Sequence, residues 1–348
     1  MSMSTDLSNI SPALETSGLS IGYRCGRKEG WKTVHPRVNF VLHRGELTSL
    51  IGLNGAGKST LLRTLCGFQP AVGGTVRVLG RELSEYSSHE LALTVGVVLT
   101  ERTNAGGLTV RELVALGRQP HTGFFGRLGE RDREVVSEAM SAVGIAHKAD
   151  SYVSELSDGE RQRTMIAKAL AQECPVIVLD EPTAFLDVAS RIETMSLLHD
   201  TARRHGKAVL LSTHDIDNAL IFSDRLLLLP SGDAPVVSGS PEDLVLDGSL
   251  KAFFGQRGMN FDVRSGQLST GVSGPEVGVD GDSLTARWMA NALARNGFTP
   301  VLPAEGIPCV RCLSPTCLEV SGTSASAPVT VSCISQAVSQ VLSCRGLK

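Results

Sequence analysis

Short apolar runs alternate with segments of helical period along residues 17 to 255 of the chain. The apolar runs "LTSLIGL", "PVIVLDEP" and "AVLLSTH" each predict a buried strand. The segments that follow them, "KSTLLRTLC", "VASRIETMSLLHDTARRHG" and "DIDNALIFS", have the period of helices. Strands that alternate with helices in this way predict an α/β fold with a largely parallel sheet.

A middle stretch, from about 100 to 172, is dense in helical period. Thr109 and Glu112 have the spacing of a capping box before "LVALG", and a second helix is expected over about 130 to 143. We therefore expect a helical subdomain within the α/β domain.

The two ends of the chain differ from this pattern. Residues 1 to 16 are expected to form a flexible leader, and residues 256 to 282, rich in Gly, Ser and Asp, a linker with one candidate hairpin at Ser265 and Gly266. Beyond the linker, "SLTARWMANALARNGF" predicts an amphipathic helix, followed by short strands ending in "APVTVSC" and a last helix "ISQAVSQVLS". We expect a small α+β accessory domain over 283 to 348. No internal repeat has a fixed period.

Composition narrows the class of protein. The chain has 348 residues, 42% of them hydrophobic, which is enough for a sizeable core. Its formal charge of −3, from 36 acidic and 33 basic residues, gives no reason to expect nucleic-acid binding. No apolar run approaches the roughly 18 to 20 residues that span a bilayer, and the leader lacks the pattern of a signal peptide. A cytosolic protein is expected.

Five of the eight cysteines lie between residues 309 and 344. Cys309 and Cys312 have a C-x-x-C spacing that could open a zinc or iron–sulfur site. No second C-x-x-C follows, no histidine occurs after His214, and on a strand the two thiols would point to opposite faces. Free thiols are the preferred interpretation.

The stretch "GLNGAGKST" matches the pattern G-x-x-x-x-G-K-[ST], after a predicted strand and before a predicted helix. Its glycines let the backbone curl so that successive N–H groups and the helix N-terminus face a phosphate chain. In this pattern Lys58 neutralises phosphate charge and Ser59 ligates Mg²⁺. The loop residues expected to contact the ligand are Asn54, Gly55, Ala56, Gly57, Lys58, Ser59 and Thr60.

Two carboxylates follow the apolar run "VIVL". This places Asp180 and Glu181 at the C-terminal edge of a buried strand, where the ligands of open α/β sheets bind. Asp180 is expected to hold the Mg²⁺ shell, and Glu181 to polarise an attacking water as general base.

These motifs together resemble the nucleotide-binding subunit of an ATP-binding cassette (ABC) transporter, a P-loop NTPase, over about residues 17 to 255. "LSDGE" resembles the family's signature motif, Leu-Ser-Gly-Gly-Gln, with two substitutions. The resemblance implies that Ser157 and Gly159 contact ATP bound to the phosphate loop of a second subunit. The residues alone also allow a simpler interpretation, in which Ser157 and Glu160 form a capping box that starts a helix.

Further positions follow the family pattern. Tyr23, in "LSIGYR", resembles the aromatic that stacks on adenine, and Asp187, in "AFLD", the loop aspartate that couples the two sites. His214, in "LSTHD", resembles the switch histidine that contacts the γ-phosphate. The resemblance thus implies that Glu181, His214 and Lys58 are catalytic.

One position departs from the family. The family places a glutamine that reaches Mg²⁺ at the end of the strand that here reads "VGVVLTERTNAGG", where this chain has Thr100 followed by Glu101. Either Thr100 acts through a bridging water or Glu101 replaces the glutamine.

The segment "LTVRELVALGRQPHTGFFG" is similar to one in ATPases of importers for iron-siderophore complexes, haem and cobalamin. This resemblance implies a homodimer that drives two transmembrane permease subunits, with an external substrate-binding protein as an indirect partner. It also implies a peripheral location on the cytoplasmic face of the inner membrane. Two alternatives are a soluble ABC ATPase, which would normally carry two cassettes, and a ligand-sensing regulatory ATPase controlled by the accessory domain.

Overall fold

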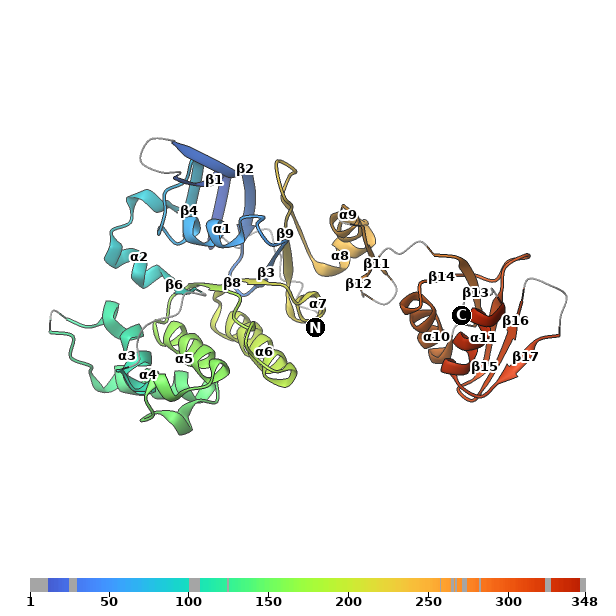
Figure 1. Ribbon diagram of the computed structural model, residues 1–348. Helices are drawn as coiled ribbons and strands as arrows, with labels where there is room; N and C mark the ends of the chain where they lie inside the picture. The colour runs from blue at the N-terminus through green and yellow to red at the C-terminus, as the bar shows by residue number, and fades with distance from the viewer. Residues whose placement is uncertain are drawn as a thin grey trace, which may run out of the picture. The chain divides into compact units, whose positions relative to one another are not determined.

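The computed structural model describes residues 12–24, 30–99, 107–123, 125–256, 258–263, 266, 268–270, 274–281, 283–322 and 327–344. Thr100 and Glu101 lie outside this set. The chain forms two compact units (Figure 1). Unit 1 contains Met1–Gln256 and Phe261–Gln267, and unit 2 contains Arg257–Asn260 and Leu268–Lys348.

A six-stranded sheet forms the centre of unit 1, in the order β10-β9-β3-β8-β7-β6. All neighbours are parallel except β10, which is antiparallel to β9. The predicted parallel α/β sheet is therefore confirmed. The strands are β3 (Leu47–Gly52), β6 (Val95–Val98), β7 (Val176–Asp180), β8 (Ala208–Thr213), β9 (Arg225–Leu229) and β10 (Val237–Gly239).

A second, antiparallel sheet in unit 1 has the order β2-β1-β4-β5. Its strands are β1 (Leu14–Arg24), β2 (Trp31–Leu42), β4 (Gly73–Val78) and β5 (Arg81–Glu82). The strand β1 begins inside the stretch 1 to 16 that was expected to be a flexible leader. The reason is burial, because Ala13 and Leu14 are fully buried in the core.

Nine α-helices accompany the two sheets in the described part of unit 1. The helix α4 and the capping box of Thr109 and Glu112, which starts α3, lie where the sequence predicted them. With α5, these helices pack together as the helical part of unit 1. The helices are α1 (Lys58–Leu65), α2 (Ser88–Thr94), α3 (Val110–Ala115), α4 (Glu130–Ala142), α5 (Asp158–Ala171), α6 (Val188–His205), α7 (Ile216–Phe222), α8 (Pro241–Leu246) and α9 (Ser249–Gly255).

Two apolar clusters pack on opposite faces of the central sheet. Along β7, Val176 and Val178 belong to the cluster shared with α1 and the antiparallel sheet, whereas Ile177 and Leu179 belong to the cluster shared with α3 to α6. Successive strand residues point to opposite faces, so a strand covered on both sides must be apolar throughout. The continuous run "VIVL" therefore places Asp180 at the edge of a sheet that is buried on both faces.

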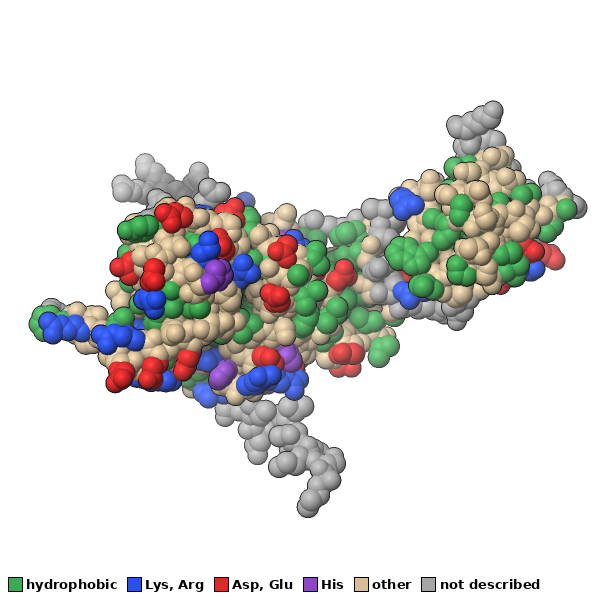
Figure 2. Space-filling view, turned by 90° about the horizontal axis from the view of Figure 1, so that it is seen from below, with side chains coloured by type: hydrophobic (Ala, Val, Ile, Leu, Met, Phe, Trp, Pro, Cys, Tyr) green, Lys and Arg blue, Asp and Glu red, His purple; other side chains and the backbone are tan. Residues whose placement is uncertain are grey.

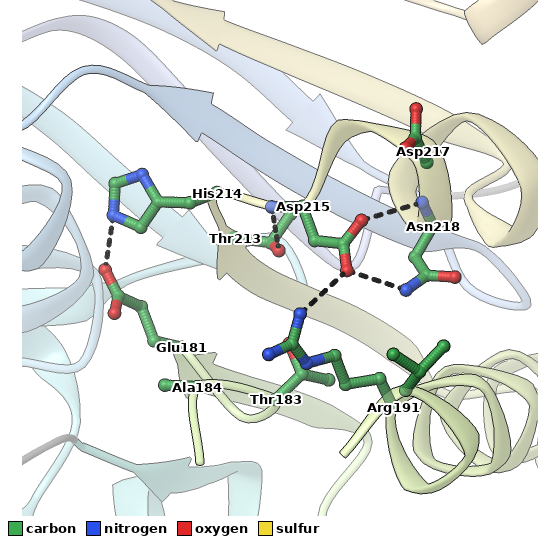
Figure 3. Close-up of a pocket in the computed structure, with 10 residues that line it drawn as sticks. Glu181, Thr183, Ala184, Arg191, Thr213, His214, Asp215, Asp217 and Asn218 are labelled. Atoms are coloured by element: carbon green, nitrogen blue, oxygen red, sulfur yellow. Dashed lines mark hydrogen bonds and ion pairs between the residues drawn. The ribbon is translucent and has the colours of Figure 1, made fainter. Parts of the chain in front are cut away.

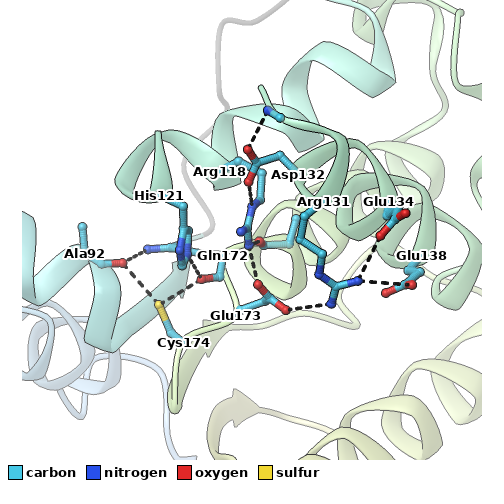
Figure 4. A network of polar contacts seen from close by, with 12 residues as sticks. Ala92, Arg118, His121, Arg131, Asp132, Glu134, Glu138, Gln172, Glu173 and Cys174 are labelled. Atoms are coloured by element: carbon cyan, nitrogen blue, oxygen red, sulfur yellow. Dashed lines mark hydrogen bonds and ion pairs between the residues drawn. The ribbon is translucent and has the colours of Figure 1, made fainter. Parts of the chain in front are cut away.

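A polar network joins α4 and the segment before it to the end of α5 (Figure 4). The buried Arg118 guanidinium donates to Asp132 at 2.9 Å, to the Ala171 carbonyl at 2.8 Å and to Glu173 at 2.6 Å. The Gly129 N–H and, next, Arg118 lower the pKa of the Asp132 carboxyl. These bonds satisfy a charge that would otherwise be costly to bury.

The described residues of unit 2 form a five-stranded sheet in the order β14-β13-β15-β16-β17 and two α-helices. The strand β13 lies inside the stretch 256 to 282 that was expected to be a linker, so the folded part of unit 2 begins earlier than predicted. The elements are β13 (Glu276–Asp280), α10 (Leu284–Arg295), β14 (Thr299–Val301), β15 (Cys309–Ser314), β16 (Cys317–Ser321), β17 (Val329–Val331) and α11 (Ile334–Cys344).

The same linker stretch contains two further strands, β11 (Met259–Phe261) and β12 (Leu268–Thr270), which pair as a small sheet. They flank the predicted hairpin position. Of the two residues named for that hairpin, Gly266 has a positive φ of 69°, and Ser265 lies outside the described residues.

The two faces of the unit 2 sheet differ. Val310 and Cys312 of β15 join the apolar cluster that also contains residues of α10 and α11. On the other face Arg311 pairs with Asp280 at 2.8 Å and with Glu319 at 3.8 Å. Figure 2 shows a face of unit 2 on which hydrophobic side chains lie among uncharged surface, with few charged side chains.

Two negative findings concern the described part of the chain. Its helices include none that is both long and apolar enough to cross a membrane. Its His, Cys, Asp and Glu side chains form no group of three or more that could hold a metal ion.

Candidate functional site

The phosphate loop connects the fully buried strand β3 to α1. Gly57 lies at the N-cap of α1 with φ of +98°, and a Cβ there would come within 2.6 Å of Val34. Only glycine adopts this conformation without strain and without a clash. The curled backbone that the sequence predicted for this loop is therefore present.

Lys58 is the first residue of α1 and its side chain turns back over the loop. Its ammonium donates to the Gly52 carbonyl at 2.8 Å and lies 3.3 Å from His214 Nε2. Burial lowers the pKa of Lys58, while the carboxylates of Glu181 and Asp180 act to raise it. The cation thus faces two carboxylates across the end of the sheet.

Asp180 and Glu181 are held by one hydroxyl from the neighbouring strand. Ser212 Oγ donates to Asp180 Oδ1 at 2.6 Å, and the Glu181 N–H donates to Ser212 Oγ at 2.9 Å. Asp180 is buried with 3% of its surface exposed, and Ser212 is fully buried. Glu181 has a φ of +50°, a left-handed conformation that is uncommon for a residue with a side chain.

His214 follows β8, and Figure 3 shows its ring facing the Glu181 carboxylate. Its Nε2 is 2.7 Å from Glu181 Oε1 and 3.3 Å from Lys58 Nζ. A ring nitrogen either carries a proton or offers a lone pair. When Nε2 carries the ring proton it donates to Glu181, and when Nε2 has the lone pair it accepts from Lys58. The tautomer of His214 therefore decides which of the two hydrogen bonds forms.

A cavity of about 410 Å³ brings most of the predicted ligand-binding residues together. Tyr23 lies on its wall, 44% exposed, with Lys32 Nζ 5.9 Å from the ring centroid. The residues that line it are Tyr23, Val34, Leu53, Asn54, Gly55, Gly57, Lys58, Ser59, Thr60 and Glu181. The aromatic ring can stack on a nucleotide base, and the backbone N–H groups of the loop can bind its phosphate chain. The lysine can neutralise the charge of those phosphates.

A second cavity, of about 610 Å³, shares Glu181 with the first. Figure 3 shows Arg191, on α6, pointing toward Asp215. The two side chains are 3.7 Å apart, and Arg191 Nε donates to the Leu186 carbonyl at 2.9 Å. Arg191 therefore links the loop before α6 to the residue that follows His214.

Ser157, Gly159 and Asp187 do not line the cavity that holds the phosphate loop. Ser157 caps α5, with Glu160 completing the capping box, as the simpler interpretation predicted. Asp187 caps α6 by accepting from the Ser190 N–H at 2.8 Å, and this bond lowers the pKa of the Asp187 carboxyl. Both side chains thus have a local structural role.

Ser212 is a residue that the sequence reading missed. The signal for it is weak, because a serine in "AVLLSTH" is a small polar residue within an apolar strand. Its relevance depends on the parallel register that places it opposite Asp180.

Comparisons with known proteins agree with this geometry. A family profile described as "ABC transporter" matches residues 36–184. The ferric enterobactin transport ATP-binding protein FepC of Escherichia coli (strain K12) is 38% identical over 244 residues, covering 70% of this chain and 88% of FepC. The iron(3+)-hydroxamate import ATP-binding protein FhuC of Bacillus subtilis (strain 168) is 34% identical over 242 residues, covering 70% of this chain and 87% of FhuC.

Solved structures include the dimeric structure of MJ0796, described as a bacterial ABC transporter cassette. It matches with a TM-score of 0.58 and 27% identity, over 66% of this chain and 98% of that one. A post-hydrolysis structure of the same cassette, bound to ADP and Pi, matches with the same TM-score of 0.58 and the same coverage.

Proposed function

The chain belongs to the ABC transporter ATP-binding family and is an ABC ATPase, and on that premise we propose that it powers an importer. The proposed cargo is an iron-siderophore complex, haem or a cobalamin-type compound. FepC and FhuC, at 38% and 34% identity, support an iron-chelate cargo. The proposed partners are a second copy of the chain and two transmembrane permease subunits, with an external substrate-binding protein as an indirect partner.

The catalytic proposal rests on three side chains at the sheet edge, Lys58, His214 and Glu181. The Nε2 atom of His214 lies 3.3 Å from Lys58 Nζ and 2.7 Å from Glu181 Oε1. In the proposed mechanism the phosphate loop and Lys58 bind the phosphates, and Tyr23 stacks on the adenine. His214 contacts the γ-phosphate, and Glu181 accepts a proton from the attacking water.

The oxygen donors at the sheet edge suit Mg²⁺, a hard cation that is usually held by one or two carboxylates plus substrate phosphates. Ser59 and Asp180 would hold it, and Thr100 is a further proposed ligand. When bound, Mg²⁺ would neutralise charge on the phosphate oxygens.

We also propose that two chains dimerise head to tail, so that Ser157 and Gly159 of one subunit complete the site of the other and Asp187 couples the two sites. The dimeric MJ0796 cassette supports dimerisation. In a mixture of Lys58→Ala and Ser157→Arg subunits, each heterodimer would retain one intact composite site. ATP hydrolysis should then recover relative to either inactive homodimer. Verified heterodimers that stay inactive would count against the composite site.

Peripheral attachment to the cytoplasmic face of the inner membrane through the permease follows from this proposal. The test is isolation of the tagged chain from native membranes, followed by reconstitution with the co-purified permease and a screen of ferric siderophores, haem and cobalamin. We expect one cargo to be taken up only with ATP, and Lys58→Ala to abolish that uptake. Isolation without any permease would contradict the importer role.

A second candidate function is a regulatory ATPase controlled by unit 2, which has an apolar cluster of its own. Removal of unit 2 tests it. A chain that ends at Gly266 keeps the buried Phe261, which stacks with Phe254 of α9 at 6.2 Å. We expect this chain to fold and bind ATP while its dimerisation or its coupling to transport changes. Unchanged dimerisation and transport would remove the regulatory candidate, and loss of folding would show that unit 2 supports the ATPase unit.

A further inference from the structure

We propose that Ser212 is a positioning residue that fixes both carboxylates of the ATPase site with a single hydroxyl. This inference rests on the proposed roles of Asp180 and Glu181. Ser212 lies directly opposite Asp180 in the parallel pairing of β7 and β8. Its side chain is fully buried between the strands, so water cannot replace what the hydroxyl provides.

The directions of the two hydrogen bonds are fixed by chemistry. The Glu181 N–H can only donate, so Ser212 Oγ accepts from it at 2.9 Å. The hydroxyl proton is then available for Asp180 Oδ1, which can accept it at 2.6 Å. A hydrogen bond to an ionised carboxylate is shorter and stronger than one between neutral groups, and this distance fits such a bond.

The backbone of Glu181 shows why the first bond matters. Its φ of +50° is a left-handed conformation that persists only where the surroundings hold it. The bond from its N–H to Ser212 is one such restraint, and the turn closed by the Ala184 N–H on the Glu181 carbonyl is another. The Glu181 side chain leaves the sheet from this held backbone, and its carboxylate reaches His214 at 2.7 Å.

Without the hydroxyl, Asp180 loses a donor and the Glu181 N–H loses its acceptor at the same time. The substitution Ser212→Ala should therefore lower kcat for ATP hydrolysis about tenfold or more, while KM for ATP changes far less. The Mg²⁺ concentration that gives half of the maximal rate should rise, because Asp180 is the proposed ligand. A change confined to stability would not produce this separation of kcat, KM and Mg²⁺ dependence.

Two other variants at the same position separate hydrogen bonding from size. Ser212→Thr keeps the hydroxyl and should recover most of kcat and the Mg²⁺ dependence of the parent. Ser212→Cys keeps nearly the same volume with a weak donor and acceptor, and should resemble Ser212→Ala. A folded Ser212→Thr protein that is as slow as Ser212→Ala, or a Ser212→Cys protein as fast as the parent, would overturn the proposal.

Ser49 offers a matched control. It is also fully buried in the central sheet, and its Oγ lies 2.6 Å from Ser223 Oγ. Ser49→Ala removes the buried hydrogen bond between Ser49 and Ser223, which involves neither carboxylate. The kcat and the Mg²⁺ dependence should therefore remain those of the parent. Equal losses in Ser49→Ala and Ser212→Ala would show that any buried hydroxyl of this sheet matters equally.

The outcomes also separate this inference from the proposed function. If the parent hydrolyses ATP and Glu181→Gln does not, but Ser212→Ala behaves as the parent, only the role of Ser212 is wrong. If Glu181→Gln keeps the parent rate, the catalytic proposal itself fails. In the Glu181→Gln background, Ser212→Ala should lose the part of its effect on rate that acts through Glu181, but it should still raise the Mg²⁺ requirement, because Asp180 remains.

Discussion

The two units of the chain handle their charged side chains in different ways. Unit 1 has charged groups inside the fold, at Asp180 at the sheet edge and in the network of Arg118, beside exposed pairs such as that of Arg131 and Glu134. Unit 2 keeps its ion pairs on an exposed sheet face, where the Arg311 side chain is 60% exposed. A buried charge affects stability or chemistry because its partners must replace water, whereas an exposed pair competes with water. Burial, more than the number of charges, therefore decides how much a charged pair contributes to stability or chemistry.

The largest effect is expected from removal of the buried cation Arg118. Arg118→Ala removes the buried guanidinium that Asp132 and Glu173 share, so that Glu173 keeps Arg131 at 3.7 Å and Asp132 keeps the Gly129 N–H, and it should lower the free energy of unfolding by about 3 kcal/mol or more. Denaturant unfolding measures this change. Arg131→Ala is the control, since the Arg131 side chain is 63% exposed in the same region. Equal losses for the two variants would break the distinction between buried and exposed pairs.

The next effect concerns chemistry. Glu181→Gln removes the proposed base but keeps the size of the side chain, so ATP turnover should fall by about 10² or more while ATP binding persists. The same variant should accumulate as an ATP-bound dimer. Steady-state hydrolysis and size-exclusion chromatography with ATP test both expectations. Parent turnover in this variant would show that the buried sheet edge of unit 1 is not the catalytic centre.

A smaller effect should depend on pH. The folded pKa of Asp132 is lowered from its ordinary value of 3.8, first by the Gly129 N–H and then by Arg118. Its contribution to stability is thus fully present above that value and is lost as pH falls through the lower folded pKa. Asp132→Asn should be less stable than the parent at pH 7, and the gap should narrow at low pH. A gap that stays constant on acidification would contradict the role of the ionised carboxylate.

A still smaller effect is expected in unit 2. Arg311→Ala removes a guanidinium that pairs with Asp280 and Glu319 on the exposed sheet face. Water can replace both contacts, so we expect the Tm to stay close to that of the parent. Differential scanning calorimetry at low and high salt tests this expectation. A loss as large as that of Arg118→Ala would show that the sheet face of unit 2 is covered in the working protein.

The smallest effect is expected at the cysteines. Cys312 lies in the apolar cluster of unit 2, and burial raises the pKa of its thiol. Cys309 is only partly buried, and Arg311, in the same strand, points to the ion-pair face opposite Cys312. Replacing Cys309 and Cys312 by serine should leave the metal content at background in mass spectrometry of the purified protein. Stoichiometric zinc or iron that disappears on replacement would contradict this expectation.

The sequence predicts the parts of the fold in which each residue is constrained by its immediate neighbours. The continuous apolar run before Asp180 is typical of a strand buried on both faces, and the glycines before Lys58 are typical of a phosphate-binding loop. Motifs of this kind predicted the phosphate loop and both carboxylates. They also predicted the capping box that starts α5 at Ser157.

Contacts between distant segments could not be predicted in this way. The strand β13 contains Gly278 and lies in a stretch rich in glycine, so its sequence resembles that of a linker. In the structure a glycine suits position 278, because a Cβ there would approach Pro303 Cα to 3.1 Å. The role of Ser212 depends likewise on its register opposite Asp180, which no local pattern reveals.

The interrupted course of unit 1 has a consequence for synthesis of the chain. Residues Phe261–Gln267 return to unit 1 after Arg257–Asn260 have already contributed to unit 2. Phe261, which is 1% exposed, is thus the last described core residue of unit 1 to leave the ribosome. Domains generally fold as units, N-terminal first, during synthesis. Here the ATPase unit cannot complete its packing until translation has passed Phe261, which follows the first residues of unit 2 in the chain.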